Sequence, residues 1–122
     1  MNVDLSGRPA DVLNELYRDW LNNEPMKRQA FNESNIKPKT PREEYALRKE
    51  FYMPINIECG NLLYGLIKAN KPSTVVEFGT SFGISTLFIA AALKENNQGM
   101  VYTTEYFEEK VAKAKESFKK AE

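Results

Sequence analysis

A short apolar run that passes directly into a glycine-framed helix start constrains the fold of this chain more than any other feature. Residues 74–78 read TVVEF, and residues 84–93 read ISTLFIAAAL. Gly79 and Gly83 lie between the two runs. A buried strand that turns tightly into a helix is typical of α/β folds, which bind ligands at the carboxyl ends of their strands. We therefore expect an α/β fold with a binding site at residues 77–85.

Helical patterns precede this strand. Residues 6–9 (SGRP) predict a helix start, and apolar side chains then recur every three or four positions as far as residue 21. Residues 22–40 contain two prolines and few apolar side chains, so we expect an irregular linker there. Residues 40–43 (TPRE) resemble a capping box that begins a helix running toward Tyr52, and a further helical stripe covers residues 56–70.

A second strand and a last helix follow. Residues 100–104 (MVYTT) alternate and include β-branched side chains, and residues 107–118 carry one apolar stripe among glutamates and lysines. The order β-α-β-α implies two parallel, neighbouring strands, because such crossovers are right-handed and join adjacent strands. We expect a helical N-terminal segment over residues 1–52 and an α/β part over residues 53–122.

Composition excludes several classes of function. The chain has 17 basic and 17 acidic residues, so no net charge attracts nucleic acid or a membrane surface. It has no histidine, which excludes histidine general bases, Ser-His-Asp triads and histidine-containing metal sites; we expect no metal site. Cys59 is the only cysteine and is expected to be a small buried residue. No signal-like start or membrane-length apolar run is present, so we expect a cytoplasmic protein.

The glycine loop is suited to a ligand other than a pyrophosphate. Gly79 and Gly83 allow positive φ angles or close approach of a ligand to the backbone, although plain turn glycines would give the same spacing. The loop lacks the middle glycine of the dinucleotide fingerprint and the Lys-Ser/Thr pair of a phosphate loop. The first-turn N–H groups near residues 82–85 are free to receive a carboxylate.

Two acidic residues follow the predicted strands. Glu77 belongs to the end of the first strand, and Glu105 follows the second, 22 residues beyond Gly83. Doubly wound folds place an acid at about this distance to bind ribose hydroxyls, although a helix-start acid is the alternative for Glu105. A carboxylate in the position of Glu77 suits an ammonium group. S-adenosylmethionine offers a ribose, an amino group, a carboxylate and a positive centre, and it would satisfy all these groups.

The stretch EFGTSFGIS at residues 77–85, with Lys71-Pro72 before it and Glu105-Tyr106 after it, resembles the class I S-adenosylmethionine-dependent methyltransferases. The likeness is greatest to small-molecule O-methyltransferases of the catechol and caffeoyl-CoA type, and it covers about residues 53–122. It implies the N-terminal half of a Rossmann-like methyltransferase fold. In this family, the adenine-binding acid, the metal-binding aspartates and the catalytic residues come after the second strand's helix, so we assign no catalytic residue here.

The resemblance also implies roles for single residues. The acid of the first motif, Glu77, contacts the methionine amino end, and Glu105 holds the ribose. Ser85 bonds the methionine carboxylate, and residues 53–55 line the methyl end of the cofactor. The cofactor-binding residues implied in this way are Ile55, Glu77, Gly79, Thr80, Ser81, Gly83, Ser85, Glu105 and Tyr106.

We therefore expect the N-terminal part of a methyltransferase that acts on a small-molecule methyl acceptor, with no complete active site of its own. In the full family fold the first strand is central, so we expect an open apolar edge here and a homo-oligomer. A non-catalytic oligomerisation or interaction module derived from a methyltransferase is the alternative. A nicotinamide-binding half domain is a third possibility, which preferential binding of NAD would reveal.

Overall fold

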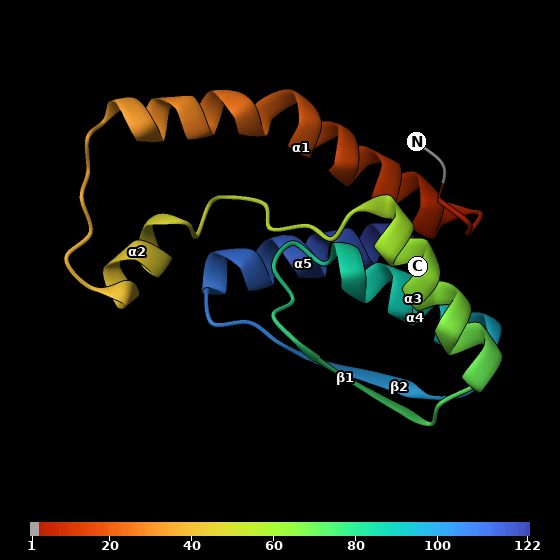
Figure 1. Cartoon of the computed structure of the whole chain (residues 1–122). Helices are drawn as coiled ribbons and strands as arrows, with labels where there is room; N and C mark the ends of the chain where they lie inside the picture. The colour runs from red at the N-terminus through yellow and green to blue at the C-terminus, as the bar shows by residue number, and fades with distance from the viewer. Residues whose placement is uncertain (1–2) are drawn as a thin grey trace.

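Both strands and the helices after residue 56 form where the sequence predicts them. The computed structural model describes residues 3–122, and Figure 1 shows its helices on one side of a small sheet. In chain order the elements are α1 (Arg8–Glu33), α2 (Pro41–Leu47), α3 (Ile57–Asn70), β1 (Thr74–Phe78), α4 (Ile84–Glu95), β2 (Met100–Thr104) and α5 (Glu108–Ala121).

The two strands pair in parallel, as the β-α-β-α order predicts. Their register runs from Thr74 opposite Met100 to Phe78 opposite Thr104. Helix α4 makes the crossover between them. This arrangement brings the carboxyl ends of both strands, and therefore the segments that follow them, to the same edge of the sheet (Figure 1).

Helices α3 and α4 cover the inner face of the sheet. They pack against each other, and α4 also contacts β2. Along each strand the residues alternate, so that Val75 and Val101 point toward these helices and are partly buried. The cluster that they join consists of Ile67, Ile89, Ala92 and Leu93.

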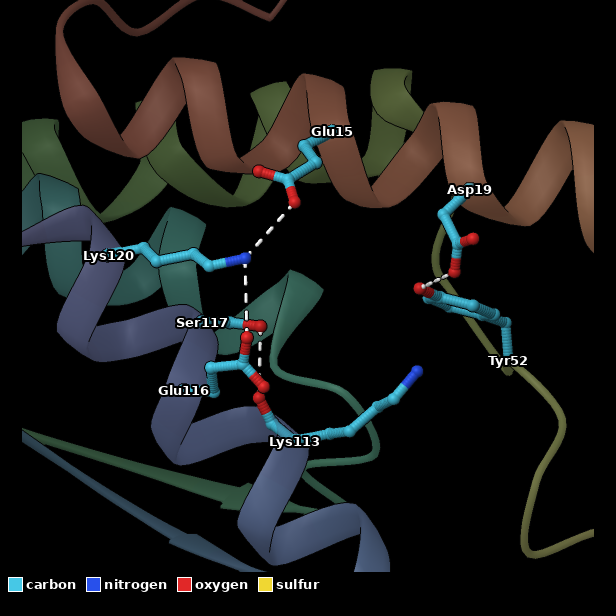
Figure 2. Close-up of polar contacts among 7 residues, drawn as sticks. All are labelled: Glu15, Asp19, Tyr52, Lys113, Glu116, Ser117 and Lys120. Carbon is cyan, nitrogen blue, oxygen red and sulfur yellow. Dashed lines mark hydrogen bonds and ion pairs between the residues drawn. The ribbon is translucent and has the colours of Figure 1, made fainter.

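The N-terminal half of α1 is built into the main hydrophobic core. Leu13 and Tyr17 are buried in the same cluster as Leu87 and Phe88 of α4. Phe88 is fully buried, and its ring packs closely on Gly60: a Cβ at this glycine would lie only 2.4 Å from the nearest ring atom. Helix α1 also packs on α5, where Lys120 Nζ lies 3.1 Å from Glu15 Oε1 (Figure 2). The helical N-terminal segment and the α/β part therefore share one core.

The predicted irregular linker over residues 22–40 is wrong for its first part. Helix α1 continues through Pro25 to Glu33, and the segment without regular structure is residues 34–40. A proline costs one backbone hydrogen bond inside a helix. Side-chain pairs four residues apart support the helix on both sides of it: Asn23 with Asp19, Arg28 with Glu24, and Gln29 with Glu33. These pairs offset part of the cost of Pro25 in the mostly exposed second half of α1.

Two further expectations are corrected. Thr40 caps α2 as predicted, accepting a hydrogen bond from Glu43 N at 3.2 Å, but the helix ends at Leu47 and a turn leads on to Tyr52. Cys59 is exposed and not buried as predicted. Its neighbour on α3, Gly60, faces the core and packs on Phe88, so Cys59 points to another side of the helix. In residues 3–122, no helix is both long enough and apolar enough to cross a membrane.

Candidate functional site

The loop between β1 and α4 has three positive φ angles within five residues. They are 89° at Gly79, 49° at Ser81 and 93° at Gly83. A Cβ at Gly83 would lie 2.6 Å from the Phe118 ring, so this glycine also serves packing against α5. A Cβ at Gly79 would meet nothing within 4 Å. The backbone at Gly79 is therefore open, and a positive φ at the non-glycine Ser81 is typical of binding loops.

The end of β2 holds the beginning of this loop in place. Both Gly79 N and Thr80 N donate to Thr104 O, at 3.1 and 2.9 Å. The Thr80 hydroxyl donates to the Thr103 hydroxyl at 2.5 Å, because Thr103 gives its own proton to Glu77, and it lies 3.1 Å from Thr104 O. The loop is thus fixed before any ligand arrives, which is the preorganisation that binding sites need.

Glu105 connects the loop to the start of α5. Its Oε2 accepts from Ser81 N at 2.8 Å, and its Oε1 accepts from Tyr106 N and Phe107 N at 2.9 and 3.0 Å. Glu105 lies two residues before Phe107, the N-cap of α5, so it bonds the segment that leads into the helix and is not a first-turn acid. Each carboxylate oxygen can accept two hydrogen bonds, so Oε2 keeps acceptor capacity beside its bond to Ser81.

Glu77 is held from behind the loop by three hydroxyl groups. Ser85 donates to Oε1 at 2.5 Å, while Thr86 and Thr103 donate to Oε2 at 2.5 and 2.6 Å. The carboxylate thereby ties the end of β1 to the first turn of α4 and to β2. Its two oxygens already accept three bonds, so Glu77 supports the loop structurally whatever else it binds.

A small pocket lies between the glycine loop and the segment before α3. One wall is formed by residues 52–55, and the other by the loop and the first turn of α4. Gly83 at the helix start provides no side-chain cap, so the first N–H groups of α4 are available near the pocket. The lining residues are Tyr52, Met53, Pro54, Ile55, Gly79, Thr80, Ser81, Phe82, Ile84 and Ser85.

Helix α1 holds the outer wall of this pocket. The Tyr17 hydroxyl donates to Ile55 O at 2.8 Å, and Arg28 donates to Tyr52 O at 3.2 Å. Burial, and then the charge of Glu58, raises the pKa of Tyr17 to about 12, so that it remains a donor. The Tyr52 hydroxyl donates to Asp19 Oδ2 at 2.5 Å, and Figure 2 shows Lys113 of α5 extending toward this pair. Nothing in the sequence pattern indicates a site role for Tyr52, because its partners lie on a distant helix.

Replacing Tyr52 with phenylalanine should lower the free energy of unfolding by about 1–2 kcal/mol at neutral pH. The hydrogen bond from Tyr52, helped by Asn23 and Lys113, lowers the pKa of Asp19 in the folded state. The bond therefore stabilises the fold above the unfolded-state pKa of about 4 and loses its effect as the pH falls through the folded-state pKa. Urea unfolding at about pH 7 and about pH 3 should show the difference between the two proteins shrinking in acid; an unchanged difference would contradict this role.

A second, open hollow lies on the other side of Gly79. Its lining residues are Tyr45, Phe78, Gly79, Thr104, Glu105 and Tyr106. Tyr45 comes from α2, stacks on Phe107 with ring centroids 4.9 Å apart, and lies 6.5 Å from the Tyr106 ring. Sequence reasoning missed Tyr45, since nothing in the pattern of α2 indicates that it lies beside the end of β2.

A buried lysine of α5 lies next to the loop between β1 and α4. Lys110 of α5 is only 3% exposed, and its Nζ lies 3.5 Å from Ser81 Oγ and 5.4 Å from the centre of the Phe82 ring. Burial lowers the pKa of Lys110, and the carboxylates of Glu105 and Glu24 act in the opposite direction. This residue was not predicted, and it places a positive centre next to the glycine loop.

The structure thus gathers most of the predicted site residues into two adjoining hollows. Ile55, Thr80, Ser81 and Ser85 line the first, Glu105 and Tyr106 line the second, and Gly79 lines both. Glu77 and Gly83 line neither and act behind the loop. Within residues 3–122, no group of three or more histidine, cysteine or acidic side chains is arranged to hold a metal ion.

Comparison with known proteins gives a structural likeness but no sequence match. No family model matches the chain. No curated protein matches it either. Among solved structures it is similar to the SAH-bound methyltransferase PaMTH1 of Podospora anserina, with a TM-score of 0.53 and 23% identity over 81% of this chain. The chain spans 45% of the length of that methyltransferase. With two parallel strands joined through α4, the chain therefore has part of a Rossmann-like methyltransferase fold.

Proposed function

We propose that this chain is the cofactor-binding part of an S-adenosylmethionine-dependent methyltransferase, of the type that transfers a methyl group to an oxygen of a small molecule. The observation that carries the proposal is the open backbone of Gly79, where the two hollows meet. A ligand that passes over Gly79 reaches the start of α4 on one side and Glu105 on the other. The likeness to an SAH-bound methyltransferase supports the same ligand class.

The first hollow suits the methionine end of the cofactor. A carboxylate placed there would meet the uncapped N–H groups at the start of α4, which carry partial positive charge. Lys110, behind Ser81, adds positive charge close to this end of the loop. Met53, Pro54 and Ile55 form an apolar wall on the opposite side, which suits the methyl and methylene groups next to the sulfur.

The second hollow suits the adenosine end. The remaining acceptor capacity of Glu105 Oε2 is available to a ribose hydroxyl, and a hydrogen bond to a charged group contributes about 1.5–3 kcal/mol. The aromatic rings of Tyr45 and Tyr106 offer apolar faces for a planar base. The first hollow thus offers donors for a carboxylate and an apolar wall, and the second offers an acceptor for a ribose and aromatic faces for a base.

Methyl transfer needs an acceptor held in line with the sulfonium centre, and we assign no residue of this chain to that role. A non-catalytic interaction module is the second candidate, favoured by a bare apolar sheet face that is described below. We place the protein in the cytoplasm, since the unpaired, exposed thiol of Cys59 suits a reducing compartment.

Calorimetric titration with SAH should show binding to the unaltered chain, and Glu105→Ala should weaken that binding at least about 10-fold. The expected loss follows from removing the ribose acceptor together with the bond that holds Ser81 N. Glu108→Ala is the matched control, because Glu108 is exposed in the first turn of α5 and lines neither hollow.

Absence of binding heat at millimolar SAH would contradict the proposal, and so would tighter binding of NAD than of SAH. Thermal melts followed by circular dichroism should accompany the titration. They separate a binding defect in Glu105→Ala from a loss of folded protein.

A further inference from the structure

The outer face of the sheet is apolar and exposed. Its largest side chains are Val76 and Phe78 of β1, which are 66% and 93% exposed, and Met100 and Tyr102 of β2, which are 58% and 57% exposed. Thr74 and Thr104 complete the face. None of these side chains is charged, although 28% of the residues in the chain are. Contiguous apolar patches on this scale mark interaction surfaces.

The composition of the strands supports burial of this face. Parallel sheets are normally covered on both faces, and their strands are accordingly apolar on both. Here α3 and α4 cover the inner face, while Figure 1 shows the other side of the sheet without any helix. The outward residues therefore have the character of core residues without a covering layer.

The strand register gives this face a defined relief. Opposite each large side chain lies a smaller one: Met100 opposite Thr74, Tyr102 opposite Val76, and Phe78 opposite Thr104. The large side chains thus form a ridge that follows β2 and then crosses to β1. The shorter side chains opposite it, Thr74, Val76 and Thr104, leave the face lower beside this ridge.

We propose that a second copy of this chain covers the face, through a two-fold contact of sheet on sheet with the helices outside. A two-fold axis parallel to the strands and midway between them places β1 of one copy across from β2 of the other at the same height. Tyr102 then faces Val76 of the second copy, Met100 faces its Thr74, and Phe78 faces its Thr104. Each large side chain of the ridge then packs over a shorter side chain of the other copy. The same contacts occur twice, as an isologous interface requires.

Known sheet packing permits this arrangement. Packed sheets lie about 10 Å apart with strands aligned to within about 30°, which leaves space for interdigitating side chains. Because the face carries no charge, placing it on itself brings no like charges together. A second copy therefore fits the face without a penalty from unpaired charge.

The size of the face predicts a reversible dimer. An aromatic side chain presents about 150–250 Å² of surface. From their exposed fractions, the four large side chains offer on the order of 500 Å² per copy, or roughly 1,000 Å² for the pair. Specific interfaces begin at about this size, and the smaller ones are transient. We therefore expect dimers at concentrations on the order of 10–100 µM that dissociate on dilution.

Sedimentation velocity over a concentration series should show this dimer for the unaltered chain and a monomer for Tyr102→Glu at the same concentrations. Tyr102 is exposed in the single chain and lines neither hollow of the cofactor site, so the substitution should leave the monomer folded. Leu62→Glu is the matched control: Leu62 is 63% exposed but lies on α3, and the variant should dimerise like the unaltered chain.

Crosslinking tests the orientation of the two copies. In the proposed dimer Thr104 lies at the same height as Thr104 of the second copy, whereas an antiparallel arrangement would put the two at opposite ends of the strands. Thr104→Cys, in a chain whose exposed native thiol is removed by Cys59→Ser, should therefore be joined into a dimer by a short bismaleimide. Leu62→Cys in the same background should stay uncrosslinked.

Four results would overturn the proposal. A monomer at all concentrations would mean that a different molecule, or solvent, meets this face. Open-ended larger species would indicate association through the strand edges instead. A dimer that survives Tyr102→Glu, or fails to crosslink at Thr104→Cys, would place the contact elsewhere. None of these results depends on cofactor binding, so the proposed function is tested separately.

Discussion

Replacing Phe88 with alanine is expected to lower the free energy of unfolding by about 3–5 kcal/mol and the melting temperature by roughly 10–20 °C. Phe88 is fully buried at the point where α4 meets α3 and the N-terminal half of α1. The Gly60 backbone is packed directly on its ring, so the neighbouring helices cannot easily close the space that alanine would leave. Urea and thermal unfolding followed by circular dichroism measure both quantities.

Leu66→Ala is the control for this prediction. Leu66 is an aliphatic residue on α3 that is half exposed, so its truncation should change stability by less than about 0.5–1 kcal/mol. Equal losses from Phe88→Ala and Leu66→Ala would mean that the cluster around Phe88 is not the main core.

Replacing Glu77 with alanine is expected to cost about 2–4 kcal/mol, because three hydroxyl groups lose a charged acceptor at once. Ser85, Thr86 and Thr103 all donate to this carboxylate, and together they join β1, α4 and β2 beneath the glycine loop. The loop should also become more mobile. Unfolding measurements give the energetic cost, and amide hydrogen exchange at residues 79–85 reports the mobility.

Glu77→Gln separates the structural role from a role of charge in binding. Its amide keeps the shape and one acceptor oxygen, and the surrounding hydroxyls can reorient, so the cost should fall to about 1 kcal/mol. If Glu77→Gln destabilised the fold as much as Glu77→Ala, the hydroxyl contacts would not explain the role of this residue.

The sequence was sufficient to predict the local elements of the α/β part. Strand β1 is a β-branched run that is followed by a glycine, and α4 comes next with mostly apolar side chains, so both were placed within a residue or two. The parallel pairing of β1 with β2 followed from the order of the elements alone. These features depend on local preference and on the handedness of crossovers, which a single sequence contains.

Features that depend on distant contacts were not predictable in the same way. Helix α1 passes through Pro25 because side-chain pairs and contacts with the segment at Phe51 and Tyr52 support it. Tyr45 and Lys110 reach the site from α2 and α5, at positions that only the folded chain brings near the loop. A sequence pattern gives the helix, but it does not show which of its side chains approaches a distant strand end.

The candidate site was predicted as a set of residues more accurately than as a set of roles. Gly79 and Glu105 line the same hollow, and their binding of a cofactor stays a prediction. Gly83 proved to be required by the Phe118 ring as well as by its φ angle, and the Ser85 hydroxyl is bonded to Glu77. Spacing shows that residues belong to one motif, whereas hydrogen-bond partners decide what each one does.

The central claim is that one nucleoside ligand spans both hollows across Gly79. It is tested most directly by NMR of the isotope-labelled chain with SAH. We predict intermolecular NOEs from the adenine protons to the Tyr106 ring and from the homocysteine methylene protons to Ile55, with shift changes concentrated at residues 79–85 and at Glu105. NOEs confined to another surface, or no shift changes at millimolar SAH, would contradict the account.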